Sequence, residues 1–177
     1  SVISFTTPSF RDFVSQLAEL SGIKIKCLED YLNAIDIRLN LFSDAGCEYA
    51  DHSLDAGFRF VPVSSGEASS LFGKLLQTGE ISPAETVKLQ SYVLLFMGRC
   101  YARRNWNMQL HIGAKRDTNT QLRTRLGPAG GYAAIGSACD VNSLVCFLDT
   151  LNEEDSLPRT ILYTLNPADN AVFATLT

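Results

Sequence analysis

Strand-like segments alternate with helical segments along this chain, and that order constrains the fold more than any other feature. Short apolar runs at 47–50, 108–112 and 160–165 are typical of strands, and helical patterns separate them. A strand pattern that alternates with helices predicts βαβ units around a parallel sheet or a barrel. We therefore predict an α/β protein with parallel strands.

The length limits how complete such a fold can be. A closed eight-unit α/β barrel typically needs about 250 residues, and the chain has 177. A barrel-like interpretation therefore requires an incomplete barrel. Since no hinge linker, internal repeat or low-complexity tract divides the chain, we treat residues 1–177 as a single unit. The chain begins Ser-Val-Ile-Ser, so we expect the natural N-terminus to be missing or processed.

Composition excludes several classes of protein. The net charge of −4 gives no excess of positive charge for nucleic acid phosphates. The richest apolar run, 92–97, is too short to cross a bilayer. Five cysteines without a Cys-x-x-Cys pair disfavour a zinc ribbon and a disulfide scaffold, so we expect small buried hydrophobes in a reducing cytoplasm. We predict a cytoplasmic protein without nucleic acid or membrane partners.

Local signals place the helices. The clearest start is Ser82-Pro83-Ala84-Glu85, which combines a capping serine, a proline at the first helical position and a glutamate that reaches back. Ser9 is a second candidate cap. Residues 57–63 form a possible additional strand, and 114–138 a long polar and glycine-rich connection. Helices are predicted over 9–21, 28–45, 68–77, 82–104 and 140–151, and a final helix capped by Asn166 is expected to continue to residue 177.

The two histidines, His52 and His111, fall at the carboxyl ends of predicted strands. Active-site groups of parallel α/β folds project from the carboxyl ends of the strands, which makes both histidines candidates. Asp51 adds a carboxylate for proton transfer or metal coordination. The alternatives are that the histidines belong to the core and that Asp51 caps the next helix.

The connection after His111 is rich in basic side chains. Such a cluster beside a site can hold a carboxylate or a phosphate, and the alternative, favoured slightly for any one residue, is a solvated loop with scattered charges. The sequence contains no Gly-x-Ser-x-Gly elbow, no His-Glu-x-x-His and no dinucleotide-binding glycine fingerprint. The residues alone therefore indicate an α/β protein with a possible His/Asp/Arg site. Its basic members are Lys115, Arg116, Arg123 and Arg125.

Several motifs in a fixed order resemble one family. The chain is similar to uronate isomerase (glucuronate isomerase) of the amidohydrolase superfamily, which implies a distorted (β/α)8 barrel. The predicted fold is then a partial (β/α)8 TIM-like barrel of about three βα units with extra helices, the middle portion of a metal-dependent hydrolase-like barrel. The matching segments are 47–52, 106–114, 116–120, 126–128, 131–132, 135–136, 157–163 and 165–170.

The resemblance also implies a reaction. Uronate isomerases interconvert D-glucuronate with D-fructuronate, and D-galacturonate with D-tagaturonate, by metal-assisted proton transfer through a cis-enediol. By this resemblance His111 and Asp51 are catalytic, and Arg116 and His52 bind substrate. A divalent metal, expected to be zinc, belongs to the full-length enzyme. The family's first-strand His-x-His pair and last-strand Asp-x-Arg are absent from this chain, so we expect the 177 residues alone to be inactive.

Two other functions fit the same residues. One is a non-catalytic module that binds sugar acids through the basic connection. The other is a metal-dependent hydrolase on the same barrel, since one fold hosts many chemistries. The expected partners are a small uronate substrate and either further copies of the chain in a homo-oligomer or the remainder of the same polypeptide.

Overall fold

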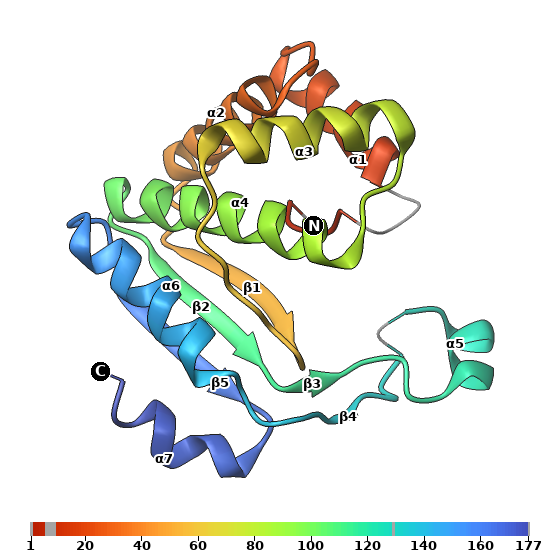
Figure 1. Ribbon diagram of the computed structural model, residues 1–177, viewed down its shortest axis with the longest axis vertical. Helices are drawn as coiled ribbons and strands as arrows, with labels where there is room; N and C mark the ends of the chain where they lie inside the picture. Colours follow the sequence, from red (N-terminus) through yellow and green to blue (C-terminus); the bar gives the residue numbers. More distant parts are fainter. Residues whose placement is uncertain (1, 6–9, 129, 177) are drawn as a thin grey trace.

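The computed structural model describes residues 2–5, 10–128 and 130–176. Helices and short strands alternate in the predicted order (Figure 1). The elements are α1 (Phe10–Ser21), α2 (Leu28–Asp44), β1 (Tyr49–Asp55), α3 (Ser65–Thr78), α4 (Pro83–Arg103), β2 (Asn107–Ile112), β3 (Ala114–Lys115), α5 (Thr120–Leu126), β4 (Ala134–Ile135), α6 (Val141–Glu153), β5 (Thr160–Thr164), a 3-10 turn (Pro167–Asp169) and α7 (Asn170–Phe173).

A parallel sheet with the order β1-β2-β5 forms the centre of the fold. In the register of these strands, Ser53 lies opposite His111, and His111 lies opposite Tyr163. All three carboxyl ends therefore meet at one edge of the sheet (Figure 1). The prediction of βαβ units around a parallel sheet is confirmed.

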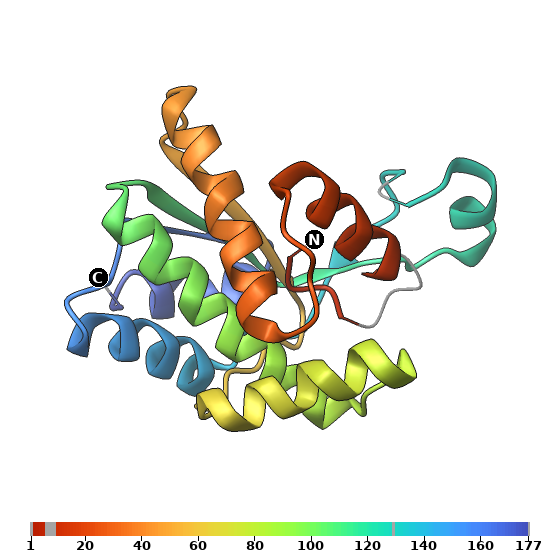
Figure 2. The ribbon, with the colours of Figure 1, turned by 90° about the horizontal axis from the view of Figure 1, so that it is seen from above.

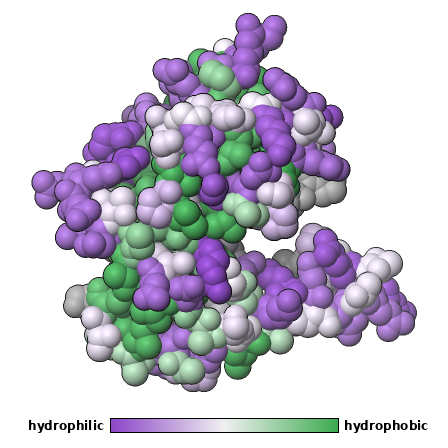
Figure 3. Space-filling view, in the orientation of Figure 1, coloured by the Kyte–Doolittle hydropathy of each residue, from purple (hydrophilic) through white to green (hydrophobic). Residues whose placement is uncertain are grey.

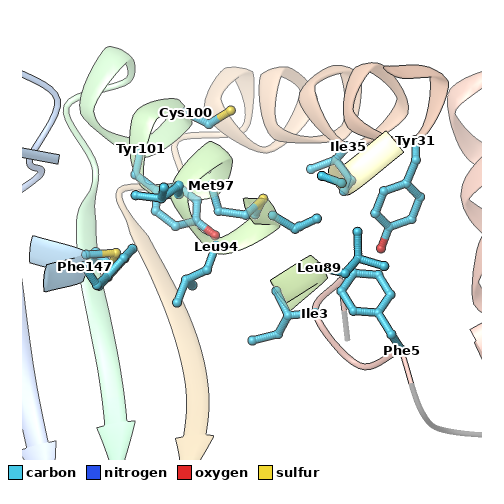
Figure 4. Packing of buried hydrophobic residues seen from close by; sticks show 14 of the residues in the cluster. Ile3, Phe5, Tyr31, Ile35, Leu89, Leu94, Met97, Cys100, Tyr101 and Phe147 are labelled. Carbon is cyan, nitrogen blue, oxygen red and sulfur yellow. The ribbon is translucent and has the colours of Figure 1, made fainter. Parts of the chain in front are cut away.

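The two faces of the sheet have different surroundings. Every second residue along the strands points to one face, and on this face Met108, Leu110 and Ile112 are buried under α4 and α6. Side chains alternate between faces along a strand, so the residues between them point to the opposite face, which is exposed. The core continues from Phe147 beside the strands to Tyr31 at the far end of the helical layer (Figure 4).

Three further helices extend this core on the side of α4 that faces away from the sheet. α2 contacts α1, α3 and α4 (Figures 1 and 2). Aromatic rings join them: Tyr31 lies 5.0 Å from Phe72 and 6.1 Å from Phe10, measured between ring centroids. Aromatic pairs at such distances stabilise a core beyond the apolar area that they bury.

The predicted caps and the observed ones agree where the structure describes them. Ser82 and Glu85 form the reciprocal capping box of α4, and Asn166 caps the turn that precedes α7. The proposed cap Ser9 lies outside the described residues. The final helix is shorter than predicted, because α7 ends at Phe173 and residues 174–176 continue as a turn and coil.

Gly57 lies in a turn and residues 58–63 are not part of a strand, which corrects the prediction. Phe60 packs into the core, yet the backbone N–H of Val61 donates to the hydroxyl of Ser91 on α4 at 3.0 Å. This backbone therefore pairs with a helix side chain rather than with a neighbouring strand.

The long connection after β2 carries structure of its own. β3 and β4 pair antiparallel, and between them the chain extends away from the body and carries α5 (Figure 1). The side chains of α5 are exposed or partly exposed, and this projection is largely hydrophilic (Figure 3). Gly136 allows the β3–β4 ribbon to approach the end of β1, since a Cβ at that position would overlap Ala56.

All five cysteines are free, which agrees with the predicted absence of a disulfide scaffold. Their burial differs from the prediction, because Cys100 is buried, Cys27 is exposed, and the other three are intermediate. Among the helices that the structure describes, none is long and apolar enough to cross a membrane.

Candidate active site

Asp51 and His111 come together on the exposed face of the sheet. They lie on neighbouring strands, and both side chains point to the face of the sheet that is turned away from α4 and α6. The imidazole Nε2 of His111 is 3.0 Å from Oδ1 of Asp51, with 46% and 60% of the two side chains exposed. A carboxylate and an imidazole at this distance can accept protons from a small molecule on this face of the sheet and return protons to it.

The aromatic ring of Tyr163 packs against His111 of this pair. Its ring is stacked on the imidazole of His111, with centroids 4.5 Å apart and planes inclined by 4°. The hydroxyl of Tyr163 accepts a hydrogen bond from Nε2 of Gln109 at 3.2 Å. No sequence pattern marks Tyr163 as a site residue, because only the register between β2 and β5 shows that it lies opposite His111.

Arg116 adds a positively charged side chain near the end of β1. Its Nε donates to Oδ1 of Asp55 at 2.8 Å, and its Nη2 donates to the hydroxyl of Ser53 at 2.6 Å. Asp55 has a positive φ of 54°, a conformation that Asp tolerates better than most residues. Arg116 therefore fixes the chain after β3 against the end of β1, on the same face as Asp51 and His111.

His52 does not join this group. It lies in the middle of β1, because the strand continues to Asp55 rather than ending near residue 50. Its side chain points into the core, where Nε2 is 2.8 Å from the hydroxyl of Tyr101. Burial lowers the pKa of His52 to about 4 against the opposing charge of Asp51, so at neutral pH it is an uncharged core residue. The structure thus places the expected substrate ligand His52 on the opposite face from the site.

The other basic residues of the connection lie apart from the pair. Nη1 of Arg123 contacts Oδ2 of Asp117 at 2.6 Å on the projection, while Lys115 and Arg125 are exposed. Of the four cations selected from the sequence, Arg116 is the one that contacts β1, through Ser53 and Asp55. Of the two interpretations of the basic connection, scattered charges describe Lys115, Arg123 and Arg125, whereas Arg116 is held at the end of β1.

The metal implied by the family resemblance needs a set of ligands. Within residues 2–5, 10–128 and 130–176, no group of three His, Cys, Asp or Glu side chains is placed to hold an ion. Asp51 and His111 supply two donor atoms. By themselves, the described side chains do not form a metal centre.

Comparison with known proteins identifies the family. A family model described as glucuronate isomerase matches residues 1–177. The chain belongs to the glucuronate isomerase family. The uronate isomerase of Caldanaerobacter subterraneus is 42% identical over 167 residues, which are 94% of this chain and 36% of that protein. The uronate isomerase of Caldicellulosiruptor bescii is 39% identical over 174 residues, which are 98% of this chain and 37% of that protein.

Solved glucuronate isomerases share the fold. The uronate isomerase of Thermotoga maritima superposes with a TM-score of 0.90 at 25% identity, over 99% of this chain and 38% of that one. The glucuronate isomerase of Caulobacter crescentus gives a TM-score of 0.84 at 27% identity, over 95% of this chain and 34% of that one. The resemblance seen in the motifs is confirmed, as is the partial TIM-like barrel. The chain spans a little over a third of the length of these relatives.

The partial barrel explains the exposed face of the sheet. In a (β/α)8 barrel the helices cover the outer face of the strands, and the inner face lines the barrel. The face covered by α4 and α6 is therefore the outer one, and Asp51, His111 and Tyr163 point to the inside of the barrel. His111 and Tyr163 each lie one residue before the end of their strand, and Asp51 lies nearer the middle of β1. The carboxyl ends of the strands are where TIM-barrel enzymes place their active sites.

Proposed function

We propose that these residues serve a uronate isomerase, in which Asp51 and His111 move the proton between C2 and C1 of a hexuronate. The proposed reactions convert D-glucuronate to D-fructuronate and D-galacturonate to D-tagaturonate. The observation that carries the proposal is the 3.0 Å contact between Asp51 on β1 and His111 near the carboxyl end of β2, in a chain of the glucuronate isomerase family.

The pair has the groups that the isomerisation requires. One base removes the proton from C2 of the aldose, the double bond forms between C1 and C2, and the aldehyde oxygen receives a proton. The product of this step is a cis-enediol. Return of a proton to C1 and removal of the proton from the C2 hydroxyl give the ketose. Of two such groups in contact, one can accept a proton from the substrate while the other donates a proton to it, which is the task of a general acid–base pair.

Arg116 is placed to orient the substrate. Since Asp55 and Ser53 engage its Nε and Nη2, we assign its third nitrogen, Nη1, to the carboxylate of the uronate. Charge-assisted hydrogen bonds between a guanidinium and a carboxylate are among the strong ones. A guanidinium fixed in advance by two protein contacts loses little freedom on binding.

A divalent metal remains an expectation from the family. When bound, such an ion polarises the sugar oxygens. Since the described residues supply two donor atoms rather than a complete ligand set, we derive no step through it. The proposal for this chain concerns proton transfer and substrate orientation.

The test is the variant His111→Asn in a full-length isomerase. The 177 residues replace the matching segment of the Caldanaerobacter uronate isomerase, to which they are 42% identical. We expect kcat/KM for glucuronate to fall by about 10²- to 10⁴-fold, the usual contribution of general acid–base catalysis, while circular dichroism stays unchanged. Tyr49→Phe is the matched control, because Tyr49 is exposed on the same face at the opposite end of β1.

Unchanged kinetics of His111→Asn would refute the assignment. The 177-residue chain assayed alone with added zinc should not turn over glucuronate, and measurable turnover would contradict our expectation that the site needs more than this chain supplies. Hydrolysis of lactones or amides by the parent chimera would favour the hydrolase alternative. Uronate binding without turnover would favour the sugar-acid-binding module.

A further inference from the structure

We infer that Tyr163 is a positioning residue for His111, an inference that rests on the proposed function of that histidine. Tyr163 lies opposite His111 in the register between β2 and β5. The two rings are 4.5 Å apart between centroids and nearly parallel, at 4°. The contact joins the third strand of the sheet to the pair formed by the other two.

The contact with Asp51 does not by itself fix the imidazole. It constrains one atom, Nε2, and leaves the ring free to turn about the line between the two residues. With 46% of its side chain exposed, His111 is not held by close packing on every side. The face of Tyr163 removes this freedom, because a stacked partner sets the plane of the imidazole. Asp51 and Tyr163 together therefore define both the position and the orientation of the ring.

Gln109 in turn holds Tyr163. It lies two residues before His111 on β2, on the same face of the sheet, and its Nε2 donates to the tyrosine hydroxyl at 3.2 Å. Since 39% of Tyr163 is exposed, this hydrogen bond limits rotation of a ring that packing alone does not enclose. The sheet thus arranges four side chains in sequence: Gln109 fixes Tyr163, Tyr163 orients His111, and His111 contacts Asp51.

Orientation matters because proton transfer depends on geometry. Misplacement of a reacting group by about 1 Å can cost on the order of 10²-fold in rate. Loss of the tyrosine ring should therefore lower kcat, whereas KM should change little, because in this proposal Tyr163 acts through His111 rather than on the substrate. Loss of the hydroxyl alone should have a smaller effect, because the stack remains.

The first experiment observes the stack directly by NMR of the 177-residue chain. With two histidines in the chain, the imidazole ring protons give two sets of signals. Protons over the face of an aromatic ring are shielded, so Tyr163→Leu should move the His111 signals downfield, and Tyr163→Phe should leave them nearly in place. The signals of buried His52 serve as the internal control for folding. If Tyr163→Leu does not fold, Tyr163→Met provides the same test.

The second experiment measures kinetics in the chimeric isomerase. We expect Tyr163→Leu to lower kcat by about 10- to 100-fold, on the same geometric grounds, with KM within about twofold, and Tyr163→Phe to restore most of the activity. Ile161→Val is the matched control, since Ile161 lies on the same strand and face and is also 39% exposed.

The outcomes separate the two claims. Unmoved His111 signals in Tyr163→Leu, or an unchanged kcat, would overturn the positioning role. A loss of activity that Tyr163→Phe shares, together with a rise in KM, would also overturn it, because the hydroxyl would then act in binding. A parent chimera without isomerase activity would refute the proposed function, while the NMR experiment would still decide whether Tyr163 orients His111.

Discussion

Acid should weaken this fold through His52 before it affects the carboxylates. Burial lowers the pKa of His52 from 6.5 in an unfolded chain to about 4 in the native core. The unfolded state therefore binds the proton first as pH falls. The contribution of neutral His52 to stability is complete above about pH 6.5 and is lost progressively as pH falls toward 4.

The size of the effect follows from the two pKa values. Linkage between protonation and folding gives a loss of about 2 kcal/mol at pH 5 and about 3 kcal/mol at pH 4, relative to neutral pH. Domains are typically stable by about 5–15 kcal/mol, so this is a large part of the total. Asp36 and Glu154, whose pKa values are lowered, lose their stabilising charge only near or below their ordinary values. The interval from pH 7 to pH 5 therefore reports mainly on His52.

Urea unfolding at several pH values between 7 and 5 measures this slope. Trp106 is the only tryptophan, and it is buried and stacked on Tyr101, so its fluorescence follows unfolding near His52. The double variant His52→Leu/Tyr101→Phe removes the titrating group and its hydroxyl partner together, so no buried polar atom of the pair is left alone. We expect its stability to be nearly constant over this interval.

His111→Asn is the matched control, because it removes the other histidine and leaves His52 in place. The loss of stability between pH 7 and pH 5 should persist in this variant. A parent chain whose stability stays constant from pH 7 to pH 5 would refute the reasoning. An undiminished slope in the double variant would refute it equally, since the titrating group would then lie elsewhere.

Two further predictions concern stability and use the same urea assay. Gly73→Ala should raise the free energy of unfolding by about 0.5–1 kcal/mol, because Gly73 lies inside α3 with open space around its Cβ position. Gly136→Ala should instead lower the free energy of unfolding by about 1–3 kcal/mol, because the new Cβ would overlap Ala56. Equal effects of the two substitutions would contradict this prediction. Asp36→Ala should cost about 1–3 kcal/mol, because Arg104, 9% exposed, would lose the carboxylate 2.8 Å from its Nη2. Addition of Arg104→Met should recover part of that loss, and no recovery would show that the cost does not come from an unpaired guanidinium.

The sequence predicted the sheet well because its strands carry clear apolar runs. Residues 108–112 and 160–165 appear as β2 and β5 within one or two residues. The first strand was predicted too short, since polar residues after 50 were interpreted as its end. The alternation of apolar and polar residues along the strand indicates a longer one. Ala50, His52 and Leu54 point to one face of the sheet, and Asp51 and Ser53 point to the other. A histidine that shares a face with an alanine and a leucine is expected to point into the core.

Other features depend on contacts that no local pattern contains. The segment at 57–63 alternates like a strand, but a helix side chain, Ser91, takes its backbone hydrogen bond. The contact of Arg116 with Asp55 joins residues 61 positions apart. The stack of Tyr163 on His111 requires the register between strands that are separated by a helix and the projection. The sequence indicates which residues are polar, and only the register shows which of them meet.

The inner face of the sheet is unusual for a barrel, and this supports a site within it. Barrel interiors are normally filled by layers of branched apolar side chains, yet β2 presents Asn107, Gln109 and His111 on its inner side. Its outer side presents Met108, Leu110 and Ile112, all buried under helices. The outer side is what packing against helices selects, and the polar inner side of β2 is the one that departs from it. A strand that keeps polar groups along its whole inner side loses apolar burial there, and the proton-transfer site proposed for Asp51 and His111 would account for that loss.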